Sequence, residues 1–244
     1  MNVFILAGGK GTRFREETSF KPKPMIEINE TPMLEHIINH YRFYGLRNFT
    51  ILAGTKIEYI FEYFNKKYTY LGENTFTYHD SNVLILDTGD ETMTGGRVNR
   101  GIEMINDENF MLTYGDGISD VNIKDLISFY YKNSFLAVVT AVRPPARFGR
   151  LKIEQNNVIE FGEKNQADEG WINGGFFVLS TKIKSYIKDD STVFEKEPLE
   201  NLSKEGKLGA FVHNGFWQPV DTIREKEILE DKFIKNQFDW YKNE

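Results

Sequence analysis

The chain contains no cysteine among its 244 residues. This absence excludes a disulfide framework, a thiol nucleophile and a cysteine-ligated metal site, and it favours a cytoplasmic protein. Long hydrophobic runs are missing too, since no apolar stretch approaches the ~18 residues of a membrane span. The chain also lacks an excess of basic residues: 30 Lys and Arg face 36 Asp and Glu, a net charge of −6. We therefore expect neither a membrane nor a nucleic acid as a partner, although a small phosphorylated ligand remains compatible with this charge.

Short apolar runs alternate with segments of helical period along the first part of the chain. The apolar runs cover residues 3–6, 49–52, 110–113 and 136–139. The segments of helical period cover residues 32–44, 56–63 and 123–131. This alternation predicts an α/β fold, doubly wound around a mixed, mainly parallel sheet.

The pattern changes in the second part of the chain. Residues 151–161 alternate around a segment of turn composition, which predicts an added β-hairpin. A further strand is predicted at residues 174–179, and a helical C-terminal part begins near Thr222. No linker or low-complexity tract separates the two parts, so we predict a single domain over residues 1–244.

A glycine-rich segment, Leu-Ala-Gly-Gly-Lys-Gly-Thr-Arg at residues 6–13, follows the first predicted strand. Glycines at 8, 9 and 11 let the backbone approach a ligand closely, so that amide N–H groups can converge on phosphate oxygens. The segment is not a dinucleotide fingerprint, because Phe14 stands where a third glycine is needed, and it is not a Walker A loop. The alternative is an ordinary tight turn between strand and helix.

Two lysines alternate with prolines in the sequence Lys-Pro-Lys-Pro-Met at residues 21–25. The prolines predict an extended segment that directs Lys21 and Lys23 to the same side. Cations near a glycine-rich loop suit a triphosphate, whose negative charge must be neutralised. Taken alone, the segment could equally be a solvated run of charges.

Five later motifs accompany these two. They are Asp-Thr-Gly at 87–89, Met-Thr-Gly-Gly-Arg at 93–97, Tyr-Gly-Asp-Gly at 114–117, Ile-Asn-Gly-Gly-Phe-Phe at 172–177 and Phe-Trp-Gln-Pro-Val-Asp-Thr at 216–222. In this order, from residue 2 to about residue 230, the sequence resembles the nucleotidyltransferases that make nucleotide sugars, and among them the glucose-1-phosphate cytidylyltransferases. The resemblance implies a Rossmann-like nucleotidyltransferase fold, with a nucleotide-binding half at 1–142 and an acceptor-binding half at 143–244.

The resemblance also implies a reaction in which a sugar 1-phosphate attacks the α-phosphorus of CTP and pyrophosphate leaves. Two anions must meet in one site, so cations are required. The implied catalytic residues are Arg13, Lys23 and Asp116, and the implied ligands of Mg²⁺ are Asp116 and Asp221. Asp116 ends an apolar run and is flanked by glycines, as suits a carboxylate at the carboxyl end of a central strand. The alternatives are a turn aspartate for Asp116 and a helix N-cap for Asp221.

The resemblance assigns binding residues to both substrates. Those implied for the nucleotide are Leu6, Ala7, Gly8, Gly9, Lys10, Gly11, Thr12, Thr94, Gly95, Gly96, Arg97 and Gly115. Within this set, Arg97 is expected to reach toward the phosphates, although a Gly-Gly-Arg sequence alone would indicate a loop. Those implied for the acceptor are Glu163, Lys164, Asn173, Gly174 and Trp217.

The sequence departs from the family near the acceptor. A Glu-Pro-Trp segment expected before Asp87 is missing, and Asn165 replaces a proline. These differences leave a second hypothesis open, that the chain is a cytidylyltransferase acting on a non-sugar acceptor such as phosphoglutamine in capsule modification. A third hypothesis is an inactive nucleotide-binding regulatory protein. The presence of Arg13, Lys23 and Asp116 argues against it.

Two further expectations concern assembly and the histidines. Relatives are commonly oligomers, and 14% of the chain is aromatic, so we predict a homo-oligomer. His36 and His40 stand four residues apart on a predicted helix, a spacing that zinc ligands also use. Because no third ligand is evident, we expect both at the edge of the buried helix face.

Overall fold

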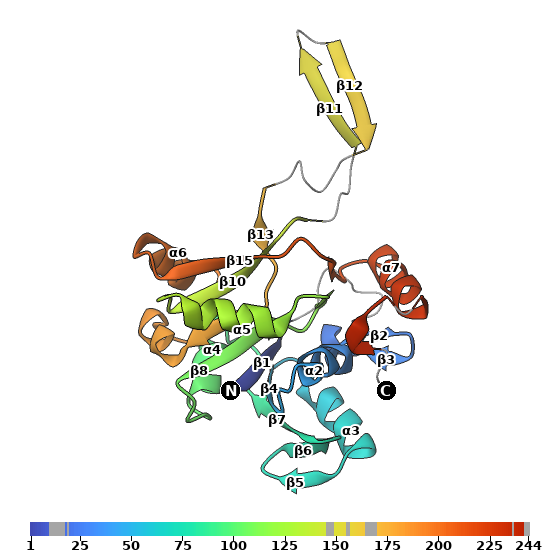
Figure 1. Cartoon of the computed structure of the whole chain (residues 1–244). Helices are drawn as coiled ribbons and strands as arrows, with labels where there is room; N and C mark the ends of the chain where they lie inside the picture. Colours follow the sequence, from blue (N-terminus) through green and yellow to red (C-terminus); the bar gives the residue numbers. More distant parts are fainter. Residues whose placement is uncertain are drawn as a thin grey trace.

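A mixed sheet forms the centre of the molecule (Figure 1). The computed structural model describes residues 1–9, 18, 20–144, 149–154, 157–163, 170–235 and 237–241. In this part of the chain the sheet has ten strands in the order β13-β10-β14-β8-β1-β4-β7-β6-β5, and β15 pairs with β10.

The four central strands of the sheet are parallel. They are β8 (Asn109–Tyr114), β1 (Asn2–Ala7), β4 (Asn48–Ala53) and β7 (Ser81–Asp87). Their nearly continuous apolar sequences suit strands that are covered on both faces. The predicted α/β fold with a mixed, mainly parallel central sheet is therefore confirmed.

Antiparallel strands extend the sheet at both sides. Next to β7 lie β6 (Thr75–Tyr78) and β5 (Tyr70–Gly72). Next to β8 lie β14 (Phe177–Ser180), β10 (Ala137–Val142) and β13 (Ile172–Asn173). The last strand, β15 (Leu208–Val212), runs parallel to β10. Strands from before and after residue 143 thus belong to one sheet.

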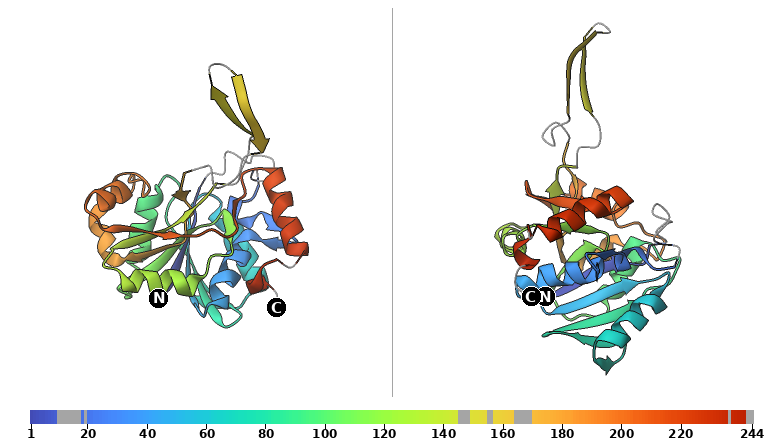
Figure 2. Two further views of the ribbon diagram at one scale, coloured as in Figure 1. Left: turned by 45° about the horizontal axis from the view of Figure 1, so that its top comes forward. Right: turned by 90° about the vertical axis from the view of Figure 1, so that its right-hand side faces the viewer.

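Helices cover both faces of the sheet because side chains alternate along each strand. In β1, Val3 and Ile5 belong to the core that contains α2 (Met33–Phe43), α3 (Ile57–Lys67), α5 (Ile123–Lys132) and α7 (Ile223–Ile234). Phe4 and Leu6 belong to the opposite core, with α4 (Thr94–Ile102), the 3₁₀ segment η4 (Thr181–Tyr186) and α6 (Glu197–Lys204). Figure 2 shows the two layers from the side.

Helix α4 begins where the isolated sequence indicated a loop. Its first turn contains Gly95 and Gly96, which disfavour helix. A Cβ on Gly95 would lie 2.6 Å from the carbonyl oxygen of Thr192, and one on Gly96 would lie 2.7 Å from Cα of Asp190. Gly95 N also donates to the Thr192 carbonyl at 2.9 Å. Close packing on this segment therefore outweighs the low helix propensity of the glycines.

The strand predicted at residues 174–179 is interrupted. Strands β13 and β14 pair with the same side of β10, and a bulge breaks the regular register between them. Within the bulge, Gly174 N donates to the Thr140 carbonyl at 2.9 Å and Thr140 N donates to the Gly175 carbonyl at 3.2 Å. Gly175 has φ +77° and Phe176 φ +47°. A Cβ on Gly174 would lie 2.6 Å from Cγ1 of Val142, so the chain here approaches β10 too closely for a side chain. The break frees the Gly174 carbonyl to accept a hydrogen bond at 2.7 Å from Nε1 of Trp217.

Shorter elements complete the fold. The predicted hairpin is present as β11 (Gly149–Glu154) and β12 (Asn157–Glu163), and it stands away from the body of the molecule (Figure 2). The remaining short elements are η2 (Lys23–Met25), β2 (Glu27–Ile28), β3 (Thr31–Pro32), β9 (Gly117–Ser119), β16 (Trp217–Pro219) and η5 (Asp239–Tyr241). Within the described residues, none of the helices is long and apolar enough to cross a membrane.

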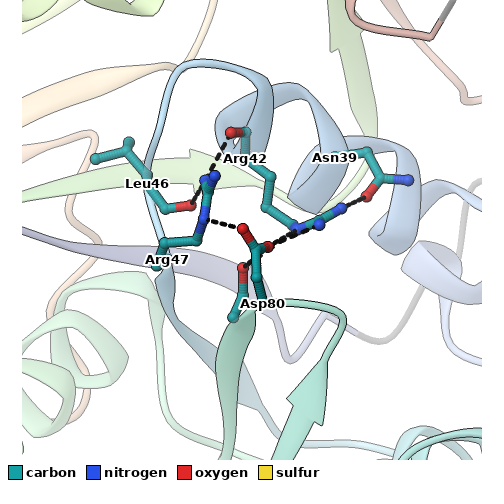
Figure 3. Close-up of polar contacts among 6 residues, drawn as sticks. Asn39, Arg42, Leu46, Arg47 and Asp80 are labelled. Atoms are coloured by element: carbon teal, nitrogen blue, oxygen red, sulfur yellow. Dashed lines mark hydrogen bonds and ion pairs between the residues drawn. The ribbon is translucent and has the colours of Figure 1, made fainter. Parts of the chain in front are cut away.

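An ionic cluster joins the turn between β6 and β7 to the end of α2 (Figure 3). Asp80 accepts from Arg42 Nη2 at 2.8 Å and from Arg47 Nε at 2.6 Å. The hydrogen bond from Arg42 is the main cause that lowers the pKa of Asp80 to about 2. Arg47 also donates to the carbonyl oxygen of Arg42, in the last turn of α2, and to that of Leu46, beyond the helix. The cluster therefore fixes the turn, which lies in the region that departs from the family, against α2.

His36 and His40 lie in the core, so the expectation that they sit at the edge of the helix face is wrong. Their side chains are only 1% and 2% exposed. His40 Nε2 donates to the Val121 carbonyl at 2.9 Å, and its ring stacks 5.3 Å from that of Trp240. Packing of α7 and the C-terminal segment over α2 covers this face, which periodicity within α2 alone could not reveal.

Candidate active site

A cavity of about 580 Å³ opens at the carboxyl ends of β1 and β8. Ligands of open α/β sheets bind at this edge, beyond the carboxyl ends of the strands. The lining residues come from segments that are distant in sequence: Leu6, Ala7, Gly8, Gly9, Lys23, Pro24, Asp90, Glu91, Thr92, Met93, Thr94, Arg97, Tyr114, Gly115, Asp116 and Asp221.

Pairing of two short strands brings Asp116 and Asp221 together. Strand β9 follows Asp116, β16 precedes Asp221, and the two strands pair antiparallel. Val220 N also donates to the Asp116 carbonyl at 2.9 Å. The N-cap of α7 is Thr222, whose side chain accepts from Glu225 N, so Asp221 is not the helix cap. Its carboxylate faces the cavity instead.

Lys23 joins the two carboxylates. Its Nζ lies 2.7 Å from Oδ2 of Asp116 and 2.7 Å from Oδ1 of Asp221. Burial acts to lower the pKa of Lys23, but the charge and hydrogen bonds of the two aspartates outweigh burial and raise it. The lysine is therefore a fixed cation at the floor of the cavity.

The segment that carries Lys23 is not wholly extended as expected. Pro22 has extended backbone, but Lys23–Met25 forms one 3₁₀ turn. Pro24 in this turn packs beneath Gly115, where a Cβ would lie 2.7 Å from its Cγ. The turn and the Gly115 contact place Lys23 beside Asp116 and leave Lys21 outside the cavity lining.

Arg97 holds the ends of two central strands. Its guanidinium donates to the carbonyl oxygens of Gly8 and Ala53, each at 3.0 Å, and to Oγ1 of Thr88 at 2.5 Å. A Cβ on Gly8 would overlap the guanidinium. Gly8 is therefore needed for contact with Arg97 as well as for any ligand. The guanidinium, expected to reach toward phosphates, is 4% exposed and bonds to the protein.

The other predicted nucleotide-binding residues divide into three groups. Leu6, Ala7, Gly8, Gly9, Thr94 and Gly115 line the cavity. Gly95 and Gly96 do not, because they face the segment at residues 190–192. Residues 10–13, which include Lys10, Gly11, Thr12 and Arg13, lie outside the described residues.

Of the predicted acceptor-binding residues that the structure describes, Asn173 contacts Tyr114 of the cavity lining, and none of them lines the cavity itself. Asn173 Nδ2 donates to the Tyr114 hydroxyl at 2.9 Å, and Trp217 binds the carbonyl of Gly174. Lys164 and the side chain of Glu163 lie outside the described residues.

Sequence reasoning missed two residues of this site. The Tyr114 hydroxyl donates to Oε1 of Glu195 at 2.9 Å, and Thr94 Oγ1 donates to Oε2 of the same residue at 2.7 Å. Tyr114 could have been found, because it stands in the motif that contains Asp116. Glu195 gave no signal, since it lies in a charged run that resembles an exposed segment.

The carboxylate pair fits a divalent metal ion. Two oxygens that converge on one cation form the kind of donor set that Mg²⁺ uses, with water or phosphate oxygens in its other positions. Among the described residues there is no group of three or more histidine or acidic side chains that could form a closed cage around a metal. The site therefore suits a metal that arrives with phosphate ligands.

Comparisons with known proteins all indicate the same family, the nucleotidyltransferases. The model for the nucleotidyl transferase family matches residues 2–225. The chain is 44% identical to glucose-1-phosphate cytidylyltransferase of Salmonella typhi, covering 98% of each chain. It is 41% identical to probable glucose-1-phosphate cytidylyltransferase of Bacillus subtilis, covering 97% of each. The crystal structure of HddC from Yersinia pseudotuberculosis has a TM-score of 0.73 and 25% identity, over 95% of this chain and 99% of that one.

Proposed function

Because the chain belongs to the nucleotidyl transferase family, we propose that this nucleotidyltransferase joins CTP to a sugar 1-phosphate, glucose 1-phosphate in particular, and releases pyrophosphate. The observation that supports it is the convergence of Lys23, Asp116 and Asp221 beside the glycine-rich segment in one cavity. The similarity to glucose-1-phosphate cytidylyltransferases supports the choice of CTP and glucose 1-phosphate.

The reaction forms one phosphorus–oxygen bond and breaks another. A phosphate oxygen of the acceptor attacks the α-phosphorus of CTP, and the bond between that phosphorus and the bridging oxygen to the β-phosphorus breaks. The attacking oxygen is already anionic at neutral pH, so no general base is required. The protein must instead neutralise and align two anions.

The cavity residues are suited to this task. As the substrate phosphates enter, the ammonium group of Lys23 would move from the aspartates toward them. Gly8 and Gly9 allow the nucleotide phosphates to approach the backbone. Arg13, outside the described residues, would hold the leaving pyrophosphate.

Nucleotidyltransferases of this family use a divalent metal, and we propose Mg²⁺ for this chain. Asp116 and Asp221 would hold it. When bound it supplies positive charge that offsets the charge on the phosphates.

The two substrates would occupy different halves of the domain. The nucleotide-binding half at residues 1–142 supplies the glycine-rich segment, Lys23 and the start of α4. The acceptor-binding half at residues 143–244 supplies Glu163, Lys164, Asn173, Gly174 and Trp217. We further propose that the protein works as a homo-oligomer.

A pyrophosphate-release assay tests the proposal. The protein is incubated with Mg²⁺ and each of ATP, CTP, GTP, UTP and dTTP, in combination with glucose 1-phosphate and with phosphoglutamine. CTP with glucose 1-phosphate should give the highest kcat/KM. A preference above ~100-fold for phosphoglutamine would overturn the sugar assignment, because unpaired polar groups produce effects of that size. No turnover with any pair, from folded protein, would reject the enzymatic function.

A further inference from the structure

We propose that Glu195 is a positioning residue that acts through Tyr114 to orient the side-chain amide of Asn173 toward the acceptor. This inference rests on the function proposed above, because the acceptor is the substrate that would meet Asn173. It assigns roles to Glu195 and Tyr114, two side chains that the sequence did not single out.

The Glu195 carboxylate fixes the Tyr114 proton. Its Oε1 accepts from the Tyr114 hydroxyl at 2.9 Å, and its Oε2 accepts from Thr94 Oγ1 at 2.7 Å. An ionised carboxylate only accepts, so the single phenol proton must point to Glu195.

The fixed phenol and the backbone N–H of Gly175 together determine the orientation of the Asn173 amide. With its proton committed, the Tyr114 oxygen can only accept, and it does so from Asn173 Nδ2 at 2.9 Å. At the other end of the amide, Gly175 N donates to Asn173 Oδ1 at 2.8 Å. One amide hydrogen and one lone pair of Asn173 then remain available for a ligand. A rotated amide would exchange donor and acceptor.

Glu195 is difficult to explain as a stabilising residue. It is partly buried, and no ion pair of the described residues includes it. Among the described residues this carboxylate has two hydroxyl donors but no cation, and a partly buried carboxylate without a cation costs folding free energy. Its two bonds instead connect cavity-lining residues of two elements, Thr94 in α4 and Tyr114 in β8. A role in placing groups of the cavity accounts for this arrangement.

Steady-state kinetics of Glu195→Gln and Tyr114→Phe test the inference. We expect KM for glucose 1-phosphate to rise at least about tenfold in each, as befits a misplaced hydrogen-bonding group. KM for CTP should change by less than about threefold, because the effect concerns binding of one substrate. In an Asn173→Ala background, Tyr114→Phe should cause no further rise, because its target is absent.

A matched control separates positioning from stability. Tyr130 donates its hydroxyl to Asn109 Oδ1 at 2.7 Å, at the opposite end of β8 from Tyr114. Tyr130→Phe removes the same kind of bond from the same strand and should lower Tm to a similar extent without changing KM for either substrate.

The side-chain amide of Asn173 gives a readout that does not depend on turnover. Its nitrogen-15 resonances, assigned by their loss in Asn173→Asp, should shift in Glu195→Gln and Tyr114→Phe but not in Tyr130→Phe. Unshifted amide resonances, or an acceptor KM that is unchanged in both variants of an active enzyme, would overturn the inference. Failure of the wild type to turn over any acceptor would instead reject the proposed function, while the amide resonances would still decide on the role of Glu195.

Discussion

Lys23 lies between two carboxylates that we propose as metal ligands, 2.7 Å from an oxygen of each. In Lys23→Met the aspartates lose this counter-charge, so the free protein should bind Mn²⁺ at least about tenfold more tightly. Turnover should nevertheless fall at least ~100-fold, because a charge that is preorganised for the phosphates is gone. Titration with Mn²⁺ by electron paramagnetic resonance measures the first effect.

The control for this variant is Lys184→Met. Lys184 forms an exposed ion pair with Glu103 at 2.9 Å and is not part of the cavity lining. The substitution Lys184→Met removes the same charge, yet Mn²⁺ affinity and turnover should stay at wild-type values. Equal or weaker Mn²⁺ binding by Lys23→Met would contradict the arrangement.

The buried histidines make stability depend on pH. Burial is the main cause that lowers the pKa of His36 and of His40 from 6.5 to about 4. Between these values the unfolded chain binds protons that the folded chain does not, so stability is full above pH 6.5 and is lost as pH falls toward 4. Each histidine contributes at most ~1.4 kcal/mol per pH unit to this loss.

Urea unfolding at pH 7 and pH 5 measures the effect. His40→Gln keeps a donor for the Val121 carbonyl but cannot titrate, so its loss of stability between the two pH values should be smaller than that of the wild type. His79 is exposed with φ +51°, a conformation that asparagine tolerates, and His79→Asn should lose as much as the wild type. Identical losses in all three proteins would show that His40 does not titrate as described.

The sequence predicted Lys23, Asp116 and Asp221 because each stands in a local motif. Their mutual contact depends on the pairing of β9 with β16, which no local pattern contains. Glu195 was missed because its partners Thr94 and Tyr114 are distant in sequence. Its own neighbours in the sequence are charged and form no motif. Chemistry can be predicted from motifs, whereas hydrogen-bond partners require the fold.

At the scale of elements, the absence of a side chain at Gly8, directly after β1, makes room for the guanidinium of Arg97. A Cβ at position 8 would overlap Arg97, whereas one at Gly9 would meet no atom within 4 Å. We expect Gly8→Ala to lose about 1–3 kcal/mol of stability, the usual cost of overpacking a buried site. Gly9→Ala is the matched control and should unfold at nearly the wild-type Tm. Similar melting temperatures for both variants would contradict the packing of Arg97 beneath Gly8.

Elements with uniform periodicity were predicted well and elements with glycines were not. Helices α2, α3 and α5 lie within a few residues of their predicted bounds, because one apolar face specifies each. Helix α4 and the break between β13 and β14 were missed. In both places a glycine permits a close approach to a residue that is distant in sequence, Thr192 or Val142. Local propensity cannot register such a contact.

At the scale of the whole molecule, the hairpin β11–β12 stands apart from the main sheet (Figure 1). An isolated two-stranded ribbon is marginally stable in water, so we expect another copy of the chain to cover it. Light scattering coupled to gel filtration should give a multiple of the 28.4 kDa chain mass. A deletion of residues 149–163 should shift the mass toward that of one chain. A wild-type protein that is monomeric at every concentration would contradict this prediction.

The central claim is that the protein joins CTP and a sugar 1-phosphate in one cavity, at Asp116. The most direct test quantifies CDP-glucose by mass spectrometry, and pyrophosphate in the same reaction, for the wild type and for Asp116→Asn. The account predicts equal amounts of the two products from the wild type and at least a ~100-fold lower kcat/KM for the variant, as expected when a charge at a phosphoryl transition state is lost. Pyrophosphate without CDP-glucose, or a variant as active as the wild type, would contradict it.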